Sequence, residues 1–249
     1  MENRINDFRL LIAIPCYNER ENIVALLDEL AQLKQAWNVL VVDDGSTDGT
    51  GAVAGPLARV LRIDSNMGIG AAIGKALRVA WEEGYDYCLQ LDGDGQHPPA
   101  EIFEMLRFQR DHPVDIVVGS RFGTRDTFRS TWERRLGIRL IRGALWALFG
   151  LNVRDPTSGF RLFNRRAIAF FSTPPLPPSM EPVSLAQAAQ AGLAIAEVSV
   201  HMRPRRHGKS SIAGVKKMTY VLRVVSDLLS TRLRATAADG GPAPTGESR

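Results

Sequence analysis

The chain has 249 residues, a formal net charge of +4 and two cysteines. This length suits one large α/β domain or two small ones, and so modest a charge does not favour nucleic acid as a partner. Cys16 and Cys88 both lie in apolar, strand-like runs, which favours buried free thiols over a disulfide. The first residues lack the apolar core of a signal peptide, and no apolar stretch reaches the ~20 residues of a spanning helix. We therefore expect a protein that is not integral to a membrane.

Strands and helices alternate along the first half of the chain. Apolar runs predict strands at 10–17, 39–42, 60–63, 87–91 and 114–119. Apolar residues at helical spacing predict helices at 21–33, from the glycine-rich turn 66–70 to about 83, and at 99–112. Strands that alternate with helices through short connections predict a parallel, doubly wound sheet.

The pattern changes after Phe122, where two long amphipathic helices are expected. Arginines and aromatic residues mark the first, at 130–151, and the second spans 212–234. Between them the pattern predicts a turn leading into a strand at 155–161, a proline-rich loop at 173–179, a short helix at 183–191 and a strand at 193–202. The final segment, 235–249, is rich in glycine, proline and alanine, which predicts a disordered tail.

The most informative motif is an apolar strand that stops at two carboxylates, Asp92 and Asp94, before a Pro-Pro pair. Carboxylates one residue apart are poor core residues and good oxygen ligands for a hard divalent cation. Mg²⁺ or Mn²⁺ held by one or two carboxylates completes its shell with water and substrate phosphates. The motif therefore suggests a metal–diphosphate site, and the competing interpretation is an acidic loop with a helix cap.

Other polar clusters are predicted to lie beside this motif. In a parallel sheet, the strands that end near Tyr17, Asp43, Asp64 and Asp92 share one edge, where α/β proteins bind ligands. A tyrosine ring can stack on a base, a carboxylate can accept hydrogen bonds from a base or a ribose, and an Asp-x-Asp pair can hold a metal on a diphosphate. This order of groups suits a nucleotide-sugar.

Seven runs in the chain together resemble a known family. They are 14–19, 41–50, 66–70, 91–99, 119–122, 155–160 and 205–210, with sequences that include Val-Asp-Asp-Gly-Ser and Asp-Gly-Asp-Gly-Gln-His-Pro-Pro. The chain resembles the family 2 inverting glycosyltransferases of the GT-A fold, and more narrowly the dolichyl- or polyprenyl-phosphate mannosyl- and glucosyltransferases. The resemblance implies an α/β fold with a Rossmann-like, mostly parallel sheet flanked by helices, followed by C-terminal amphipathic helices. It implies one domain, 1–234, with a nucleotide-binding part at about 8–122 and an acceptor part at about 123–234.

The resemblance also implies roles for individual residues. The donor nucleotide is expected at Pro15, Tyr17, Glu19, Asp43, Asp44 and Asp92. Mg²⁺ or Mn²⁺ is expected at Asp92, Asp94 and Gln96, and the catalytic residues are expected to be Asp94, Arg121 and Arg205. Phosphate or acceptor contacts are expected at Arg135, Asp155, Glu181 and Lys209, although spacing does not separate Arg135 from Arg134 and Arg139.

The activity implied is metal-dependent, inverting transfer of a sugar from GDP-mannose or a UDP-hexose to a polyprenyl or dolichyl phosphate. A lipid phosphate is already ionised, so it needs positioning and charge neutralisation rather than a general base. One alternative is transfer to a soluble or lipopolysaccharide-type hydroxyl, which would need a base such as Asp155 or Glu181. A second alternative is a regulatory protein that only binds nucleotide-sugars. In two respects the chain departs from the family: the last motif ends Ser210-Ser211 where the family usually has Ser-Lys, and the spanning helices of many relatives are missing.

The two amphipathic helices allow two interpretations. Their apolar positions can pack against the sheet and each other, or part of one face can lie among anionic lipid headgroups. Trp132, Trp146 and Phe149 are the aromatic residues that would distinguish them. On the second interpretation we expect a cytoplasmic protein that is peripheral on the cytoplasmic face of a membrane. The oligomeric state is left open.

Overall fold

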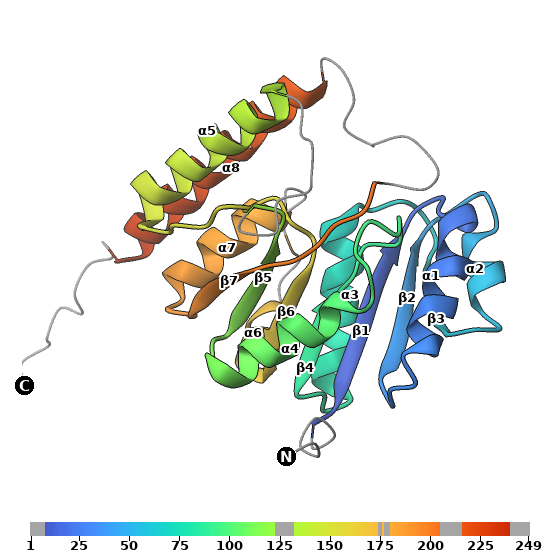
Figure 1. Cartoon of the computed structure of the whole chain (residues 1–249). Coiled ribbons are helices and arrows are strands. Elements are labelled where there is room, and N and C mark those ends of the chain that lie inside the picture. Colours follow the sequence, from blue (N-terminus) through green and yellow to red (C-terminus); the bar gives the residue numbers. More distant parts are fainter. Residues whose placement is uncertain (1–7, 123–131, 174–175, 177–179, 205–215, 240–249) are drawn as a thin grey trace, which may run out of the picture.

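A seven-stranded sheet forms the centre of the molecule in the computed structural model, which describes residues 8–122, 132–173, 176, 180–204 and 216–239 (Figure 1). The strands are β1 (Leu10–Cys16), β2 (Asn38–Asp44), β3 (Arg59–Ile63), β4 (Tyr87–Gln90), β5 (Ile116–Ser120), β6 (Arg161–Asn164) and β7 (Ile195–Ser199). They lie in the order β3-β2-β1-β4-β6-β5-β7. The helices are α1 (Arg20–Gln32), α2 (Thr50–Ala54), α3 (Ile69–Glu82), α4 (Glu101–Asp111), α5 (Trp132–Phe149), α6 (Arg165–Phe171), α7 (Met180–Gln190) and α8 (Lys216–Asp239).

Helices cover both faces of the sheet, which explains why the strands are continuously apolar. In β1, Leu11 and Ala13 join a core beneath α3, α6 and α7, whereas Ile12 and Ile14 join a second core beneath α1, α2 and α4. α1 shows the matching helical pattern, because Ile23, Leu26, Leu27 and Leu30 all face that second core. The α/β, mostly parallel sheet predicted from the sequence is therefore confirmed.

Among the described strands one departs from the parallel direction, as a mostly parallel sheet allows. β6 runs antiparallel to both of its neighbours, β4 and β5, while all other pairings are parallel. The cause is the path of the chain before β6. The Phe160 carbonyl accepts a hydrogen bond from the Gly119 N–H near the end of β5, so β6 starts at the edge where β5 ends.

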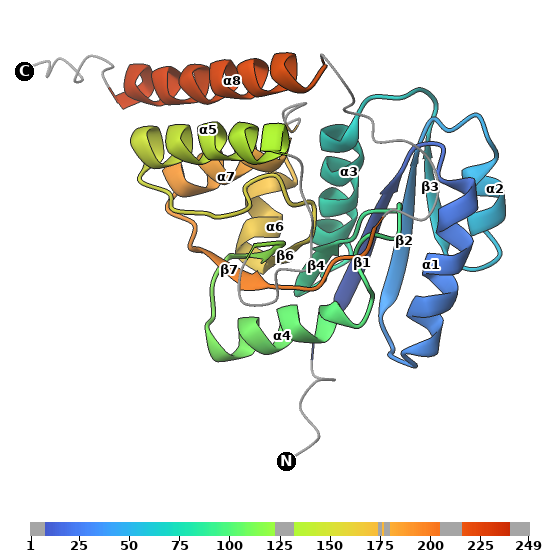
Figure 2. The same ribbon diagram turned by 45° about the horizontal axis from the view of Figure 1, so that its top comes forward.

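A third layer consists of α5 and α8, which lie side by side over α7 (Figures 1 and 2). Their shared core contains Ile141 and Leu145 of α5 and Val221, Val224 and Leu228 of α8. The packing interpretation of the amphipathic helices is therefore correct for these positions. Within the described ranges, no helix is long and apolar enough to cross a membrane.

Several boundaries differ from those predicted. The short helix α6 was not expected, and β7 is confined to Ile195–Ser199 rather than 193–202. α8 continues to Asp239, five residues beyond the predicted end of the second amphipathic helix. Three of those five residues are alanine, the strongest helix former, which lets the helix continue. The rest of the tail, 240–249, lies outside the described residues. Cys16 and Cys88 are buried free thiols, as expected.

Candidate functional site

The acidic motif forms a tight loop, residues 91–96, at the carboxyl end of β4. We call these residues the acid loop. Its shape is set by Asp94, whose Oδ1 accepts the Gln96 N–H at 3.0 Å. Glycine is required at position 93, because a Cβ there would lie 2.5 Å from the Sγ of Cys16. Both acids of the loop, Asp92 and Asp94, are half-buried, as expected for groups at the rim of a site.

A second loop, residues 155–160, passes closely over Asp92. A Cβ at Gly159 would meet Asp92 Oδ1 at 2.5 Å, so only glycine allows this approach. His97 lies next to this acid: its Nδ1 is 3.8 Å from Asp92 Oδ2, and its ring stacks on Phe160 with centroids 5.0 Å apart. Burial lowers the pKa of His97 to about 4, so its imidazole is neutral at pH 7.

The acid loop has the donor chemistry for a hard cation. Asp92 and Asp94 offer carboxylate oxygens and Gln96 an amide oxygen, which are the ligand types that Mg²⁺ and Mn²⁺ prefer. In the part of the chain that the structure describes, no cluster of three or more His, Cys, Asp or Glu side chains could hold a metal ion. The residues therefore fit a cation that shares its shell with water and a bound diphosphate, and they do not form an all-protein cage.

The Asp43-Asp44 pair organises the neighbouring loops. Asp43 is fully buried, and it accepts the Ser46 N–H at 2.9 Å and Arg62 Nη1 at 2.8 Å. Asp44 accepts the N–H groups of Met67 and Gly68 at 2.9 and 2.7 Å. Both carboxylates thus tie the end of β2 to surrounding backbone. Their expected role as nucleoside ligands stays a prediction.

The loop after β1 lies beside the loop after β2, as the topology predicted. The Asn18 N–H donates to Ser46 Oγ at 3.0 Å, and the Glu19 N–H donates to Thr50 Oγ1 at 2.9 Å. Glu19 also begins α1, because its carbonyl accepts the N–H groups of the first turn. Tyr17 is 47% exposed, so its ring is available to a ligand instead of filling the core. Pro15, within β1, is half-buried.

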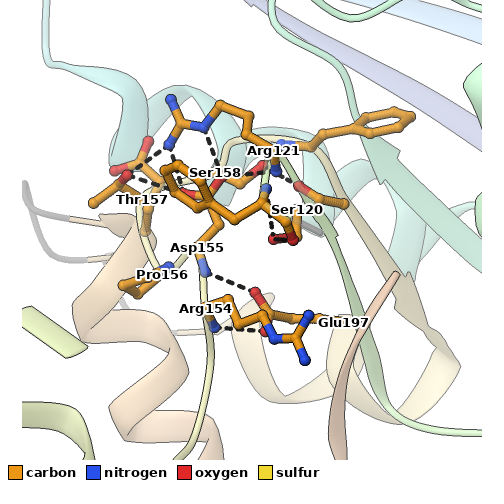
Figure 3. Close-up of polar contacts among 12 residues, drawn as sticks. Ser120, Arg121, Arg154, Asp155, Pro156, Thr157, Ser158 and Glu197 are labelled. Atoms are coloured by element: carbon orange, nitrogen blue, oxygen red, sulfur yellow. Dashed lines mark hydrogen bonds and ion pairs between the residues drawn. The ribbon is translucent and has the colours of Figure 1, made fainter. Parts of the chain in front are cut away.

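Arg121 and Asp155 form a buried ion pair at the end of β5 (Figure 3). Arg121 Nε lies 2.6 Å from Asp155 Oδ2 and Nη2 lies 2.5 Å from Oδ1, a bidentate arrangement. Nη2 also donates to Thr157 Oγ1 at 2.7 Å. Burial acts to lower the pKa of Arg121, but the charge and hydrogen bonds of Asp155 outweigh it and raise that pKa. The sequence predicted that Arg121 contacts a phosphate and that Asp155 is a possible general base. In the structure these two residues form one ion pair.

Glu197 of β7 fixes the other side of this loop. Its carboxylate accepts the N–H groups of Arg154 and Asp155 at 2.5 and 2.7 Å, as Figure 3 shows. Burial raises the pKa of Glu197. A cavity of about 300 Å³ opens beside it, lined by Ser120, Phe122, Asn152, Arg154, Glu197 and Ser199.

Arg161 was not predicted from the sequence as a residue of the site. It is fully buried at the start of β6, and its guanidinium donates to the carbonyls of Pro156, Ser158 and Glu181 and to Ser184 Oγ at 2.6–3.0 Å. Burial lowers its pKa to about 10, so it is still a cation at pH 7. It joins the 155–160 loop to the start of α7, where burial raises the pKa of Glu181. The sequence did offer one sign of this role, because Arg161 stands where the turn at 155–161 was predicted to lead into a strand.

The remaining predicted residues do not join this cluster. Arg135 is exposed on α5, a helix of the third layer. Arg205 and Lys209 lie outside the described residues, as does the side chain of Trp132. The structure therefore brings together the residues expected from the loops after β1, β2, β4 and β5, together with Asp155 and the start of α7.

Comparison with known proteins agrees with this geometry. The model of "Glycosyl transferase family 2" matches residues 11–170. The polyprenol monophosphomannose synthase of Mycolicibacterium smegmatis is 33% identical over 168 residues, which cover 64% of this chain and 63% of that protein. The chain thus spans less than two thirds of the mycobacterial relative. The undecaprenyl-phosphate mannosyltransferase of Micrococcus luteus is 31% identical over 217 residues, covering 83% of this chain and 88% of that protein.

A solved structure shows the same fold. It is glucosyl-3-phosphoglycerate synthase from Mycobacterium tuberculosis in complex with Mn²⁺, UDP-glucose and phosphoglyceric acid, which superimposes with a TM-score of 0.70. The identity is 21%, and the match covers 91% of this chain and 80% of that one. At this identity the likeness concerns the fold, which is GT-A.

Proposed function

Because the chain belongs to glycosyl transferase family 2, we propose that it transfers a hexose, with inversion, from a nucleotide-sugar to a polyprenyl phosphate, assisted by Mg²⁺ or Mn²⁺. The observation that carries the proposal is the close approach of Asp92, which shares the acid loop with Asp94, to the loop of the buried Arg121–Asp155 pair at one sheet edge. The acceptor is supported by two relatives named for mannosyl transfer to polyprenol or undecaprenyl phosphate. The donor class and metal are supported by the neighbour crystallised with Mn²⁺ and UDP-glucose.

In this proposal each loop has a part in the reaction. Tyr17 stacks on the base, and the acid loop holds the donor diphosphate through a shared cation. When bound, the cation neutralises charge on the departing nucleoside diphosphate. Arg121, fixed by Asp155, adds positive charge near the acid loop and costs no reorganisation when charge develops.

The state of Asp155 favours a phosphate acceptor over a hydroxyl. Both Asp155 oxygens accept hydrogen bonds from Arg121, so this carboxylate is not a free general base. A polyprenyl phosphate needs no base, because its oxygen is already ionised. A hydroxyl acceptor would depend instead on Glu181, whose pKa is raised by burial.

The test is to incubate the protein with radiolabelled GDP-mannose, UDP-glucose or UDP-N-acetylglucosamine, a polyprenyl phosphate and Mg²⁺ or Mn²⁺. We expect a labelled product that extracts into organic solvent and is released by mild acid. An acid-stable product on a hydroxyl acceptor would contradict the polyprenyl phosphate proposal. Tight donor binding without transfer to any acceptor would instead indicate a nucleotide-sugar-binding regulatory protein.

The outer face of α5 and α8 supports a peripheral position on a membrane. Both helices carry exposed apolar side chains: Leu136, Leu140 and Trp146 on α5, and Leu222, Leu229 and Leu233 on α8. Exposed arginines stand among them: Arg135, Arg139, Arg223, Arg232 and Arg234. We call this set of residues the helical-pair face. An apolar surface mixed with cationic side chains fits an anionic lipid headgroup region, and a lipid-linked acceptor requires access to one.

A further inference from the structure

The chain leaves β7 and crosses the carboxyl edge of the sheet towards β1 and α1 (Figures 1 and 2). We call residues 200–204 the strap. Its start is fixed at β5, where the Val200 N–H donates to the Ser120 carbonyl at 3.0 Å. Further along, the Arg203 N–H donates to the Gln96 carbonyl at 2.8 Å. The strap therefore lies directly against the acid loop.

The strap is also fixed to α1, through the side chain of Arg203. Its Nη1 lies 2.8 and 3.1 Å from the two carboxylate oxygens of Glu29. The two side chains are 41% and 25% exposed. This ion pair therefore joins the strap to α1, the helix that follows the loop carrying Tyr17.

These contacts form a continuous path to one acid of the expected metal site. Glu29 holds the Arg203 guanidinium, the Arg203 N–H holds the Gln96 carbonyl, and the Gln96 N–H holds Asp94 Oδ1 at 3.0 Å. Each step is a direct hydrogen bond, and Gln96 takes part through both of its flanking peptides, so a shift of the strap moves the residue whose N–H orients the Asp94 carboxylate.

We propose that Arg203 is a positioning residue, which acts through its ion pair with Glu29 to hold the strap, the acid loop and hence Asp94 in the geometry that glycosyl transfer requires. This inference rests on the proposed function. The pair is partly exposed, so it contributes little to global stability. A displacement of reacting groups by about 1 Å, by contrast, can lower a rate by about a hundredfold. The pair therefore matters for the reaction more than for the fold.

The experiment is a double-mutant cycle of Arg203→Gln and Glu29→Gln, with the charge-swapped variant Arg203→Glu/Glu29→Arg. Each protein is assayed for kcat, donor KM and melting temperature. The matched control is the exposed Arg59–Glu83 pair, with N···O 2.6 Å. It joins the start of β3 to the end of α3, away from the carboxyl edge, and Arg59→Gln leaves the catalytic machinery intact.

We expect each single variant to lower kcat at least about fivefold, up to about a hundredfold, with a melting temperature within about 4 °C of the wild type. The double variant should be no worse than either single one, and the swap should restore part of kcat. Arg59→Gln should change neither kcat nor KM.

Two results would overturn the inference: unchanged kcat in Arg203→Gln, or losses that simply add in the double variant, because either outcome removes the pair from the positioning path. Both results can be distinguished from a failure of the proposed function. If that function is wrong, the wild-type protein itself transfers no sugar to a polyprenyl phosphate.

Discussion

At the scale of single residues, the charge of Asp94 is predicted to matter more than its shape. Asp94→Asn keeps an oxygen that can accept the Gln96 N–H, so the acid loop keeps its form. It removes one negative charge from the expected metal site, and we expect turnover to fall about a hundredfold or more, the equivalent of several kcal/mol. Turnover measured across a Mg²⁺ and Mn²⁺ titration checks this.

The control is Asp111→Asn, which makes the same charge change at an exposed residue at the end of α4. It should leave turnover within about twofold of the wild type, as surface substitutions usually do. If Asp94→Asn kept normal metal-dependent activity, the assignment of the acid loop to the metal would be wrong.

Tyr17 is predicted to act on the donor and not on stability. Because its side chain is 47% exposed, Tyr17→Ala forms no core cavity, and we expect a melting temperature within about 2 °C of the wild type. Loss of stacking on a base, worth about 1–3 kcal/mol, should raise the donor KM roughly 5- to 150-fold. Tyr17→Phe keeps the ring and should keep the KM. A large melting drop with unchanged KM would show that Tyr17 is structural.

Some contacts of the site could be predicted from the sequence and others could not. The convergence of Tyr17, Asp44 and Asp92 on one edge was predictable, because strand ends in a parallel sheet share an edge. The pairing of Arg121 with Asp155 was not, because it depends on the antiparallel β6 that brings the 155–160 loop back to the end of β5. Periodicity describes each strand but does not give its direction.

At the scale of elements, Arg161 is predicted to hold the site loop to α7. Arg161→Met removes the donors of four hydrogen bonds and leaves buried carbonyls unsatisfied. We expect a loss of about 3–5 kcal/mol in the free energy of unfolding, or a fall of roughly 6–20 °C in melting temperature. Denaturant unfolding with two independent probes measures it.

The comparison for Arg161 is Arg107→Met on α4, where the arginine pairs with Glu104 and is 59% exposed. This variant should cost less than about 1 kcal/mol. Equal stability losses in the two variants would contradict a special role for the buried arginine.

Element boundaries were predictable where the chain carries a strong local signal. α1, α3 and α4 follow from apolar residues on one face, and their strands from short apolar runs. α6 was missed because it starts directly at the end of β6. Its N-cap, Asn164, closes β6 and also accepts the Ala167 N–H at 2.9 Å, so no loop separates the two elements. Where a helix follows a strand directly, the sequence has no glycine- or proline-rich segment to mark the boundary between them.

At the scale of the whole molecule, the helical-pair face is predicted to bind anionic membranes. α5 and α8 already bury one side against each other and α7, so the leucines and Trp146 left outside have no core to fill. Phe149, in contrast, packs against the third-layer core, which leaves Trp146 as the exposed aromatic among the described side chains of these two helices. We expect the protein to co-sediment with anionic liposomes at low salt. Binding should weaken as ionic strength shortens the Debye length from about 30 Å at 0.01 M to about 8 Å at 0.15 M.

The test of this surface is the triple variant Leu140→Ser, Trp146→Ser and Leu222→Ser, whose side chains are 48%, 66% and 63% exposed. It should keep its melting temperature and lose most of its liposome binding, because binding scales with the apolar area that enters the headgroup region. Leu57→Ser, at 49% exposure beside α2, is the matched control and should bind as the wild type does. If the folded wild-type protein stays wholly in the supernatant at low salt, the membrane surface is wrong. A soluble acceptor would then be the better explanation for the acid loop and its arginines.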